Sequence, residues 1–89
     1  MNSTAQLFDE LVAATPPDVR QRVDWSFSIA DKISGILKQR GMTQQEFADM
    51  MGCSQAEVSR WCGGVHNFTL STLAKISTTL GEPMITVAE

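Results

Sequence analysis

Apolar residues recur along most of this chain with the three- and four-residue spacing of α-helices. Near the amino terminus this spacing predicts a short helix over residues 4–14, whose apolar stripe consists of Leu7, Phe8, Leu11 and Val12. The same spacing continues from about Pro16 to Arg40 and again from Leu70 to Leu80, and a glycine follows each of these two segments. We therefore expect an all-α fold.

Prolines and one polar interruption bear on the start and the continuity of the long segment. TPPD at residues 15–18 combines a capping hydroxyl, a proline at the first helical position and an acid, which is typical of a helix start. We expect one helix from there to Arg40, ended by Gly41. The alternative is a break at residues 24–26 (DWS), where an acid and a hydroxyl could form a second cap.

Two short phrases in the middle of the chain predict two closely spaced helices. TQQE at residues 43–46 and SQAE at residues 54–57 both have the pattern of a capping box, in which a hydroxyl and a carboxylate each accept one backbone N–H. Gly52 lies between them, where a helix needs a residue with a positive φ to end. The pattern predicts a scaffold helix over residues 44–51 and a recognition helix over residues 55–62, which together form a helix-turn-helix.

The second of these helices has one apolar and one polar side. Val58 and Trp61 share the apolar side, so we expect both in the core. The opposite side carries only small or polar side chains, which are Gln55, Ala56, Ser59 and Arg60. Such a surface suits the major groove of DNA, because amides pair with adenine, arginine pairs with guanine, and a methyl group can contact thymine. These four residues are the candidates for base contacts.

The last residues alternate between apolar and other side chains, which predicts one short strand over residues 83–87. The chain contains no second predicted strand, so a second copy of the chain would have to supply the pairing partner. We therefore expect a homodimer that is held together through Met84, Ile85 and Val87.

Composition and charge limit the classes of protein to which the chain can belong. Its 89 residues, 43% of them hydrophobic, suffice for one domain with one modest core. The net charge is −3, and residues 1–31 contain five acidic and two basic side chains, whereas the charges of the remainder balance. This distribution argues against a purely electrostatic nucleic-acid binder, and it confines the excess of negative charge to the amino-terminal third of the chain.

Other features argue against membrane, metal and enzyme functions. The longest apolar runs have only a few residues and the first ten residues lack the pattern of a secretion signal, so we expect a cytoplasmic protein without a membrane span. Cys53 and Cys62 are not in metal-binding spacing and there is a single histidine, so no metal or other cofactor is expected. One histidine, no tyrosine and scattered carboxylates offer no paired acid and base, so we do not expect an enzyme.

Between residues 33 and 85, the segments TQQEFADMMGCSQAEVSRWCGG and TLSTLAKISTTLG resemble the phage-repressor-like (Xre-type) helix-turn-helix family. The resemblance implies a lambda-repressor-like helix-turn-helix bundle of about five helices. Residues 1–24 would be an N-terminal helical extension, residues 25–82 the DNA-binding domain, and residues 83–87 the dimerisation strand. It further implies a homodimeric repressor that binds a palindromic operator in double-stranded DNA.

The resemblance also assigns roles to individual residues. Gln44 would contact a phosphate and support Gln55, and the candidates for base contacts would again be Gln55, Ala56, Ser59 and Arg60. The remaining contacts with the DNA backbone would come from Ser54, His66, Asn67 and Thr69. A plainer interpretation is open for several of them, because Gln44, Ser54 and Thr69 occupy capping or first-turn positions that occur in any helical protein.

The two ends of the chain resemble one particular subgroup of this family. The acidic residues before the domain, the run IADKISGILKQRGMTQQEFA and the terminal GEPMITV are similar to the HigA-like antitoxins of toxin–antitoxin pairs. This similarity implies a protein that represses its own operon and binds a RelE-family toxin. A stand-alone or prophage-type repressor with the same ends is one alternative. Another is a protein-binding module that uses the helix-turn-helix only as a scaffold, which the acidity favours.

Overall fold

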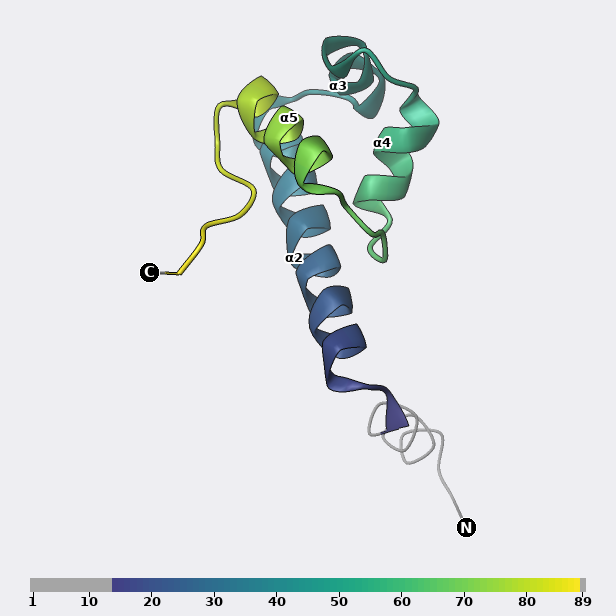
Figure 1. Ribbon diagram of the computed structural model, residues 1–89. Helices are drawn as coiled ribbons and strands as arrows, with labels where there is room; N and C mark the ends of the chain where they lie inside the picture. The colour runs from purple at the N-terminus through teal and green to yellow at the C-terminus, as the bar shows by residue number, and fades with distance from the viewer. Residues whose placement is uncertain (1–13, 89) are drawn as a thin grey trace.

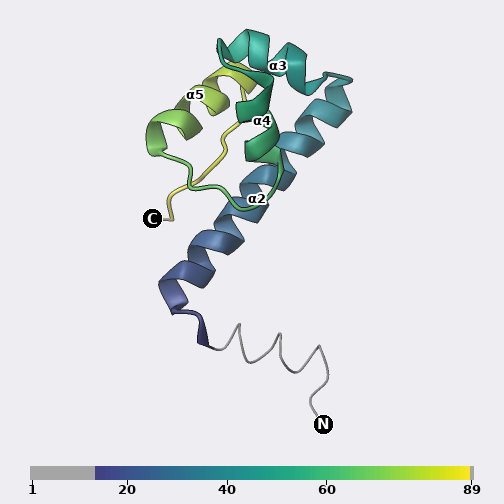
Figure 2. The same ribbon diagram turned by 90° about the vertical axis from the view of Figure 1, so that its right-hand side faces the viewer.

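The computed structural model describes residues 14–88. Its helices are α2 (Pro17–Arg40), α3 (Gln44–Met51), α4 (Gln55–Cys62) and α5 (Leu70–Leu80). The three shorter helices gather around the carboxyl-terminal half of α2, and in both views its amino-terminal half extends beyond them (Figure 1 and Figure 2). The all-α prediction is confirmed for the described part of the chain.

Two of the sequence expectations concern the amino-terminal part of the chain. The helix predicted over residues 4–14 lies outside the described residues except for Ala14, so the described part shows four helices rather than the expected five. α2 passes through residues 24–26 without interruption, which excludes the alternative of a break there. Residue 24, the end of the expected extension, is therefore an interior position of a helix of 24 residues.

The two ends of α2 follow from local chemistry. Pro17 stands at the first helical position, where its missing N–H costs nothing, and Asp18 adds a negative charge to the first turn. At the other end Gly41 adopts a left-handed conformation with a φ of 63°. The N–H of Met42 then donates to the carbonyl oxygen of Leu37 at 2.9 Å, which closes a Schellman motif and turns the chain towards α3.

The helix-turn-helix forms where the two capping phrases predict it. At α3 the Thr43 hydroxyl accepts the N–H of Glu46 at 3.0 Å and the Glu46 carboxylate accepts the N–H of Thr43 at 3.1 Å, which makes a complete capping box. At α4 only one half is present, because Ser54 accepts the N–H of Glu57 at 3.2 Å and no return bond to the carboxylate is found in residues 14–88. The second predicted box is thus a single cap.

One core joins all the described helices. Its largest fully buried side chains are Ile33, Phe47, Val58 and Ile76, one each from α2, α3, α4 and α5. The ring of Phe47 meets Trp61 of α4 edge to face, with 6.3 Å between ring centroids. The buried residues of α2 lie between Ser26 and Leu37, so its first two turns contribute nothing to this core.

The carboxyl-terminal segment does not form the strand predicted over residues 83–87, because within residues 14–88 no strand is assigned to it or to any neighbour that could pair with it. Its backbone is instead anchored to α5, where the N–H of Met84 donates to the Ser77 hydroxyl at 2.9 Å. The Met84 side chain is only 6% exposed and belongs to the core. Alternation over five residues predicts extended backbone but cannot distinguish a paired strand from a segment held by one buried side chain.

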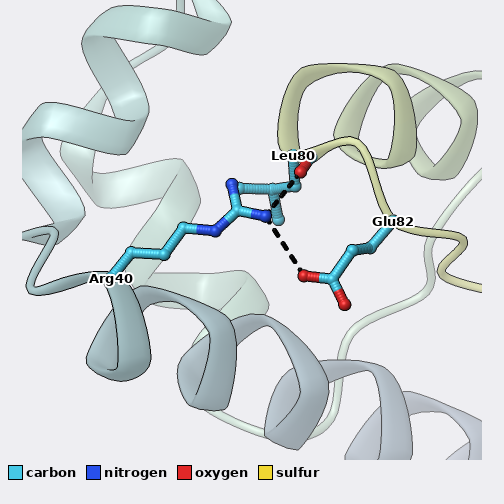
Figure 3. A network of polar contacts seen from close by, with 3 residues as sticks. All are labelled: Arg40, Leu80 and Glu82. Atoms are coloured by element: carbon cyan, nitrogen blue, oxygen red, sulfur yellow. Dashed lines mark hydrogen bonds and ion pairs between the residues drawn. The ribbon is translucent and has the colours of Figure 1, made fainter.

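Arg40, the last residue of α2, bonds to Leu80 and Glu82, and we call these contacts the arginine clasp. Nη2 of Arg40 donates to the carbonyl oxygen of Leu80 at 2.7 Å and to Oε2 of Glu82 at 3.1 Å (Figure 3). The carbonyl is one of those left without an intrahelical partner at the end of α5, so the guanidinium satisfies it. The clasp therefore ties the end of α2 to the end of α5.

Candidate nucleic-acid interface

The recognition helix α4 has one face in the core and one in solvent. Its cap at Ser54 sets where the helix begins, and Val58 and Trp61 on the inner face are both buried. The side chains of the outer face are all exposed, and they are the predicted base-contacting residues Gln55, Ala56, Ser59 and Arg60. Because packing fixes the inner face, the direction in which the outer face points is fixed too.

The polar groups of this outer face are unengaged. In the described part of the chain, the side chains of Gln55, Ser59 and Arg60 form no hydrogen bond or ion pair with other residues. An amide, a hydroxyl and a guanidinium are therefore available for an external partner, without the cost of first breaking internal bonds. Ala56 lies between them and leaves room for close approach to a base edge.

The residues predicted to contact the DNA backbone differ in whether their polar groups are already hydrogen-bonded within the protein. Gln44 is half-buried, and no hydrogen bond joins it to Gln55 in residues 14–88. The Ser54 hydroxyl accepts one backbone N–H and keeps its own proton for an outside acceptor. Thr69 accepts the N–H of Thr72 at 3.1 Å and also donates to the Thr72 hydroxyl at 2.9 Å, so its proton is already used.

The backbone of His66 is hydrogen-bonded to α2. The buried hydroxyl of Ser26 on α2 donates to the His66 carbonyl oxygen and accepts the His66 N–H at 3.3 Å. The half-buried His66 ring meets Phe68 edge to face, with centroids 4.7 Å apart, whereas the neighbouring Asn67 is exposed. The loop that leaves α4 is thus tied to the middle of α2, and Asn67 projects from a fixed turn.

Sequence reasoning missed the importance of Ser26. The sequence does contain a sign of this role, because Ser26 lies between Val23 and Ala30 on the side of α2 that faces the core. A hydroxyl at a core-facing helical position needs a partner, so it marks a place where another segment must approach.

A glycine brings the same loop close to α2. Gly64 is buried, has a φ of 110°, and a Cβ added to it would lie 2.5 Å from Cε1 of Phe27. Only glycine combines this backbone conformation with such close approach to a ring. Gly64 and Ser26 together hold the carboxyl end of α4 against α2.

The electrostatics of this region depend on few groups. Arg60 is the only basic side chain on α4. Burial, followed by the nearby charge of Glu57, raises the pKa of the Cys53 thiol in the turn above its ordinary value, so the thiol stays protonated at neutral pH. No group of three His, Cys, Asp or Glu side chains between residues 14 and 88 is placed to hold a metal ion.

None of the helices in the described range is long and apolar enough to cross a membrane.

Comparison with known proteins agrees with this architecture. A family model described as helix-turn-helix (HTH_3) matches residues 33–86, which run from the middle of α2 through α5 to the carboxyl-terminal segment. The searches among curated proteins and solved structures gave no match. The family match covers more than half of the chain and contains the whole of α3, α4 and α5. The chain therefore belongs to the Xre-like helix-turn-helix family, whose members are DNA-binding regulators.

Proposed function

We propose that this protein is a sequence-specific transcriptional repressor that places α4 in the major groove of double-stranded operator DNA. Gln55, Ala56, Ser59 and Arg60 contact base edges. The observation that carries the proposal is the outer face of α4, which is exposed, lacks bulky side chains and has unengaged polar groups on a helix held by the core. These are the properties that direct readout requires.

The contacts with the DNA backbone surround this face. Ser54 and Asn67 are the strongest candidates, because the first keeps a free hydroxyl proton and the second is exposed on a fixed loop. Gln44 at the start of α3 binds a phosphate beside them. Thr69 and the His66 ring complete the set as weaker contacts, since the Thr69 proton is already donated and the ring packs on Phe68.

The repressor acts as a homodimer on a palindromic operator. The backbone N–H and C=O groups of residues 85–88 make no hydrogen bond with other described residues, and Ile85 and Val87 are exposed. Pairing of this segment with its copy across a two-fold axis would satisfy these groups. Such a dimer presents two recognition helices to half-sites about 34–36 Å apart. Met84, the third residue expected at the interface, stays in the core of its own protomer.

A finer role follows from the charge distribution. We infer that the repressor is the HigA-like antitoxin of a toxin–antitoxin pair, which represses its own operon and binds a RelE-family toxin. Support comes from the first 31 residues, which carry five acidic and two basic side chains ahead of the domain and suit a basic partner. Co-purification of the product of the adjacent reading frame with the tagged protein tests this role. If the product of the adjacent reading frame neither binds this protein nor inhibits growth, the role of a stand-alone repressor would be favoured instead.

The DNA-binding proposal is tested by titration of an operator fragment at fixed salt. Arg60→Ala and Gln55→Ala should each weaken specific binding by about 1–3 kcal/mol and leave the thermal unfolding curve unchanged, because neither side chain contacts the core. Lys38→Ala is the matched control, since it removes one exposed positive charge from α2 and leaves α4 intact. If Lys38→Ala weakens binding as much as Arg60→Ala does, general electrostatics and not groove readout would explain the affinity.

The dimer proposal has its own test. Thr86→Pro removes a backbone N–H in the middle of the pairing segment, whereas Thr86→Ala keeps it. We expect the proline variant to sediment as a monomer with reduced operator affinity and the alanine variant to remain a dimer. A dimeric proline variant would place the interface elsewhere.

A further inference from the structure

An apolar groove of about 800 Å³ lies beside the middle of α2. Its walls come from α2, from the loop of residues 66–68, from the start of α5 and from the carboxyl-terminal segment, and they include Trp25, Ile29, Leu70, Leu73, Ile85 and Val87. The groove is separate from the outer face of α4, because none of the four base-contact candidates lines it. It shares the side chains of Ile85 and Val87 with the proposed dimer segment, whose pairing itself uses the backbone groups of residues 85–88.

Three apolar side chains in the walls of this groove are strongly exposed, whereas Ile29 and Leu73 form its buried floor. Trp25 is 63%, Leu70 73% and Val87 77% exposed. Contiguous exposed apolar surface of this kind marks a binding site, because leaving it in water forgoes the free energy of burial. The charged side chains that line the groove are Arg22 and Lys32, both basic, in a chain whose net charge is negative.

The first thirteen residues have the complementary properties. They contain Asp9 and Glu10 and no basic side chain. Their sequence predicts a helix over residues 4–14 with a continuous apolar stripe. The segment therefore offers apolar surface and negative charge to a groove that offers apolar surface and positive charge.

Length and connection also fit. A helix over residues 4–14 would span about 16 Å, and after a short connection it would run antiparallel along α2 from Pro17 to about residue 28, past Arg22 and Trp25. Ala14 is helical, and Thr15 and Pro16 separate it from the first residue of α2. Two-residue connections of this kind join the antiparallel helices of an αα-hairpin.

We propose that residues 4–13 dock in this groove of their own chain, with Leu7, Phe8, Leu11 and Val12 against its apolar walls and the acidic side chains towards Arg22. The covalent connection gives the segment a local concentration in the millimolar range, which favours it over a second copy. No residue of the outer face of α4 takes part, so the inference does not rest on the base contacts, although His66 and Asn67 line the groove and are also proposed to contact the DNA backbone.

Trp25 provides the readout, because it lines the groove, while the other tryptophan, Trp61, is buried in the core. Tryptophan emission and its quenching by acrylamide are measured for the full-length protein, for Leu11→Asp and for Gln6→Asp. Gln6 lies opposite the apolar stripe of the predicted helix, so Gln6→Asp adds the same charge without affecting the docking face. Trp25→Phe identifies the part of the signal that comes from Trp25.

We expect the parent and Gln6→Asp to show protected, blue-shifted emission. Leu11→Asp should show a shift to longer wavelength and severalfold stronger quenching, as should a protein that begins at Ala14 and keeps every residue of the core. If the parent, Leu11→Asp and the protein that begins at Ala14 are all quenched equally, the proposal is overturned. Protection that disappears on dilution, together with dissociation of a dimer in the ultracentrifuge, would also overturn it, because the segment would then come from a second copy.

Discussion

Two connections flank the recognition helix α4, and they hold it by different means. The turn before it is local: Gly52 ends α3 with a φ of 71°, the N–H of Cys53 donates to the carbonyl of Ala48 at 3.0 Å, and Ser54 caps α4. The loop after it depends on residues about forty positions away, because Ser26 and Phe27 of α2 fix its course. The direction in which α4 points is therefore set by neighbouring residues at one end and by the tertiary fold at the other.

The largest effect is expected from Gly64→Ala in the loop after α4. The methyl group would clash with the Phe27 ring and the residue would have to keep a φ of 110°. We expect a loss of about 2–4 kcal/mol in the free energy of unfolding, from overpacking and backbone strain together. Urea unfolding followed by circular dichroism measures it.

Gly52→Ala in the turn before α4 is the matched comparison, because its φ is also positive but open space surrounds the added Cβ. It should cost only the backbone strain, about 1 kcal/mol. Adding Phe27→Ala to Gly64→Ala should recover the steric part of the loss and leave the strain. Equal losses at Gly64 and Gly52 would show that close approach to α2 does not hold the loop.

Ser26→Ala is expected to have the next largest effect. It leaves the N–H and the carbonyl of His66 without their partner, at a cost of about 1–3 kcal/mol. Operator affinity should fall as well, because the loop that carries Asn67 loses its anchor. Ser28→Ala, an exposed position on the same helix, serves as the control and should change neither quantity in a thermal scan and a binding titration. A Ser26→Ala protein as stable as the parent would contradict the anchoring role.

The smallest effects are expected at the caps of the local turn. Thr43→Ala removes a reciprocal pair of bonds and Ser54→Ala a single one, so each should cost about 1 kcal/mol, with the larger loss at Thr43. Chemical denaturation of the two variants side by side gives the difference. A larger loss at Ser54 would mean that its hydroxyl does more for the turn than accept one N–H.

This contrast explains which parts of the structure the sequence could predict. The scaffold and recognition helices occur over residues 44–51 and 55–62 as predicted, because caps and a helix-ending glycine act within a few residues. The exposure of Gln55 and Arg60 followed from helical periodicity alone. The contacts of Ser26 and Gly64 could not be predicted in the same way, since their partners are brought together only by the completed fold.

The carboxyl-terminal segment shows the same limit in another form. Its alternating pattern wrongly indicated a strand, because the pattern contains no information about a pairing partner. The burial of Met84 depends on a core that exists only after the helices have packed. The second capping box failed for a related reason: Glu57 is half-buried and its carboxylate is not bonded back to the cap.

The arginine clasp at the end of α2 has a consequence for the order of folding events. Arg40 reaches Leu80 and Glu82, which are 40 and 42 positions away, whereas α3 and α4 contact each other across a turn of a few residues. Contacts that close long loops form late, because the entropy of closure must be overcome before they can stabilise the chain. The clasp should therefore slow unfolding and leave the folding rate nearly unchanged, so that its loss shortens the lifetime of the folded protein without delaying its formation.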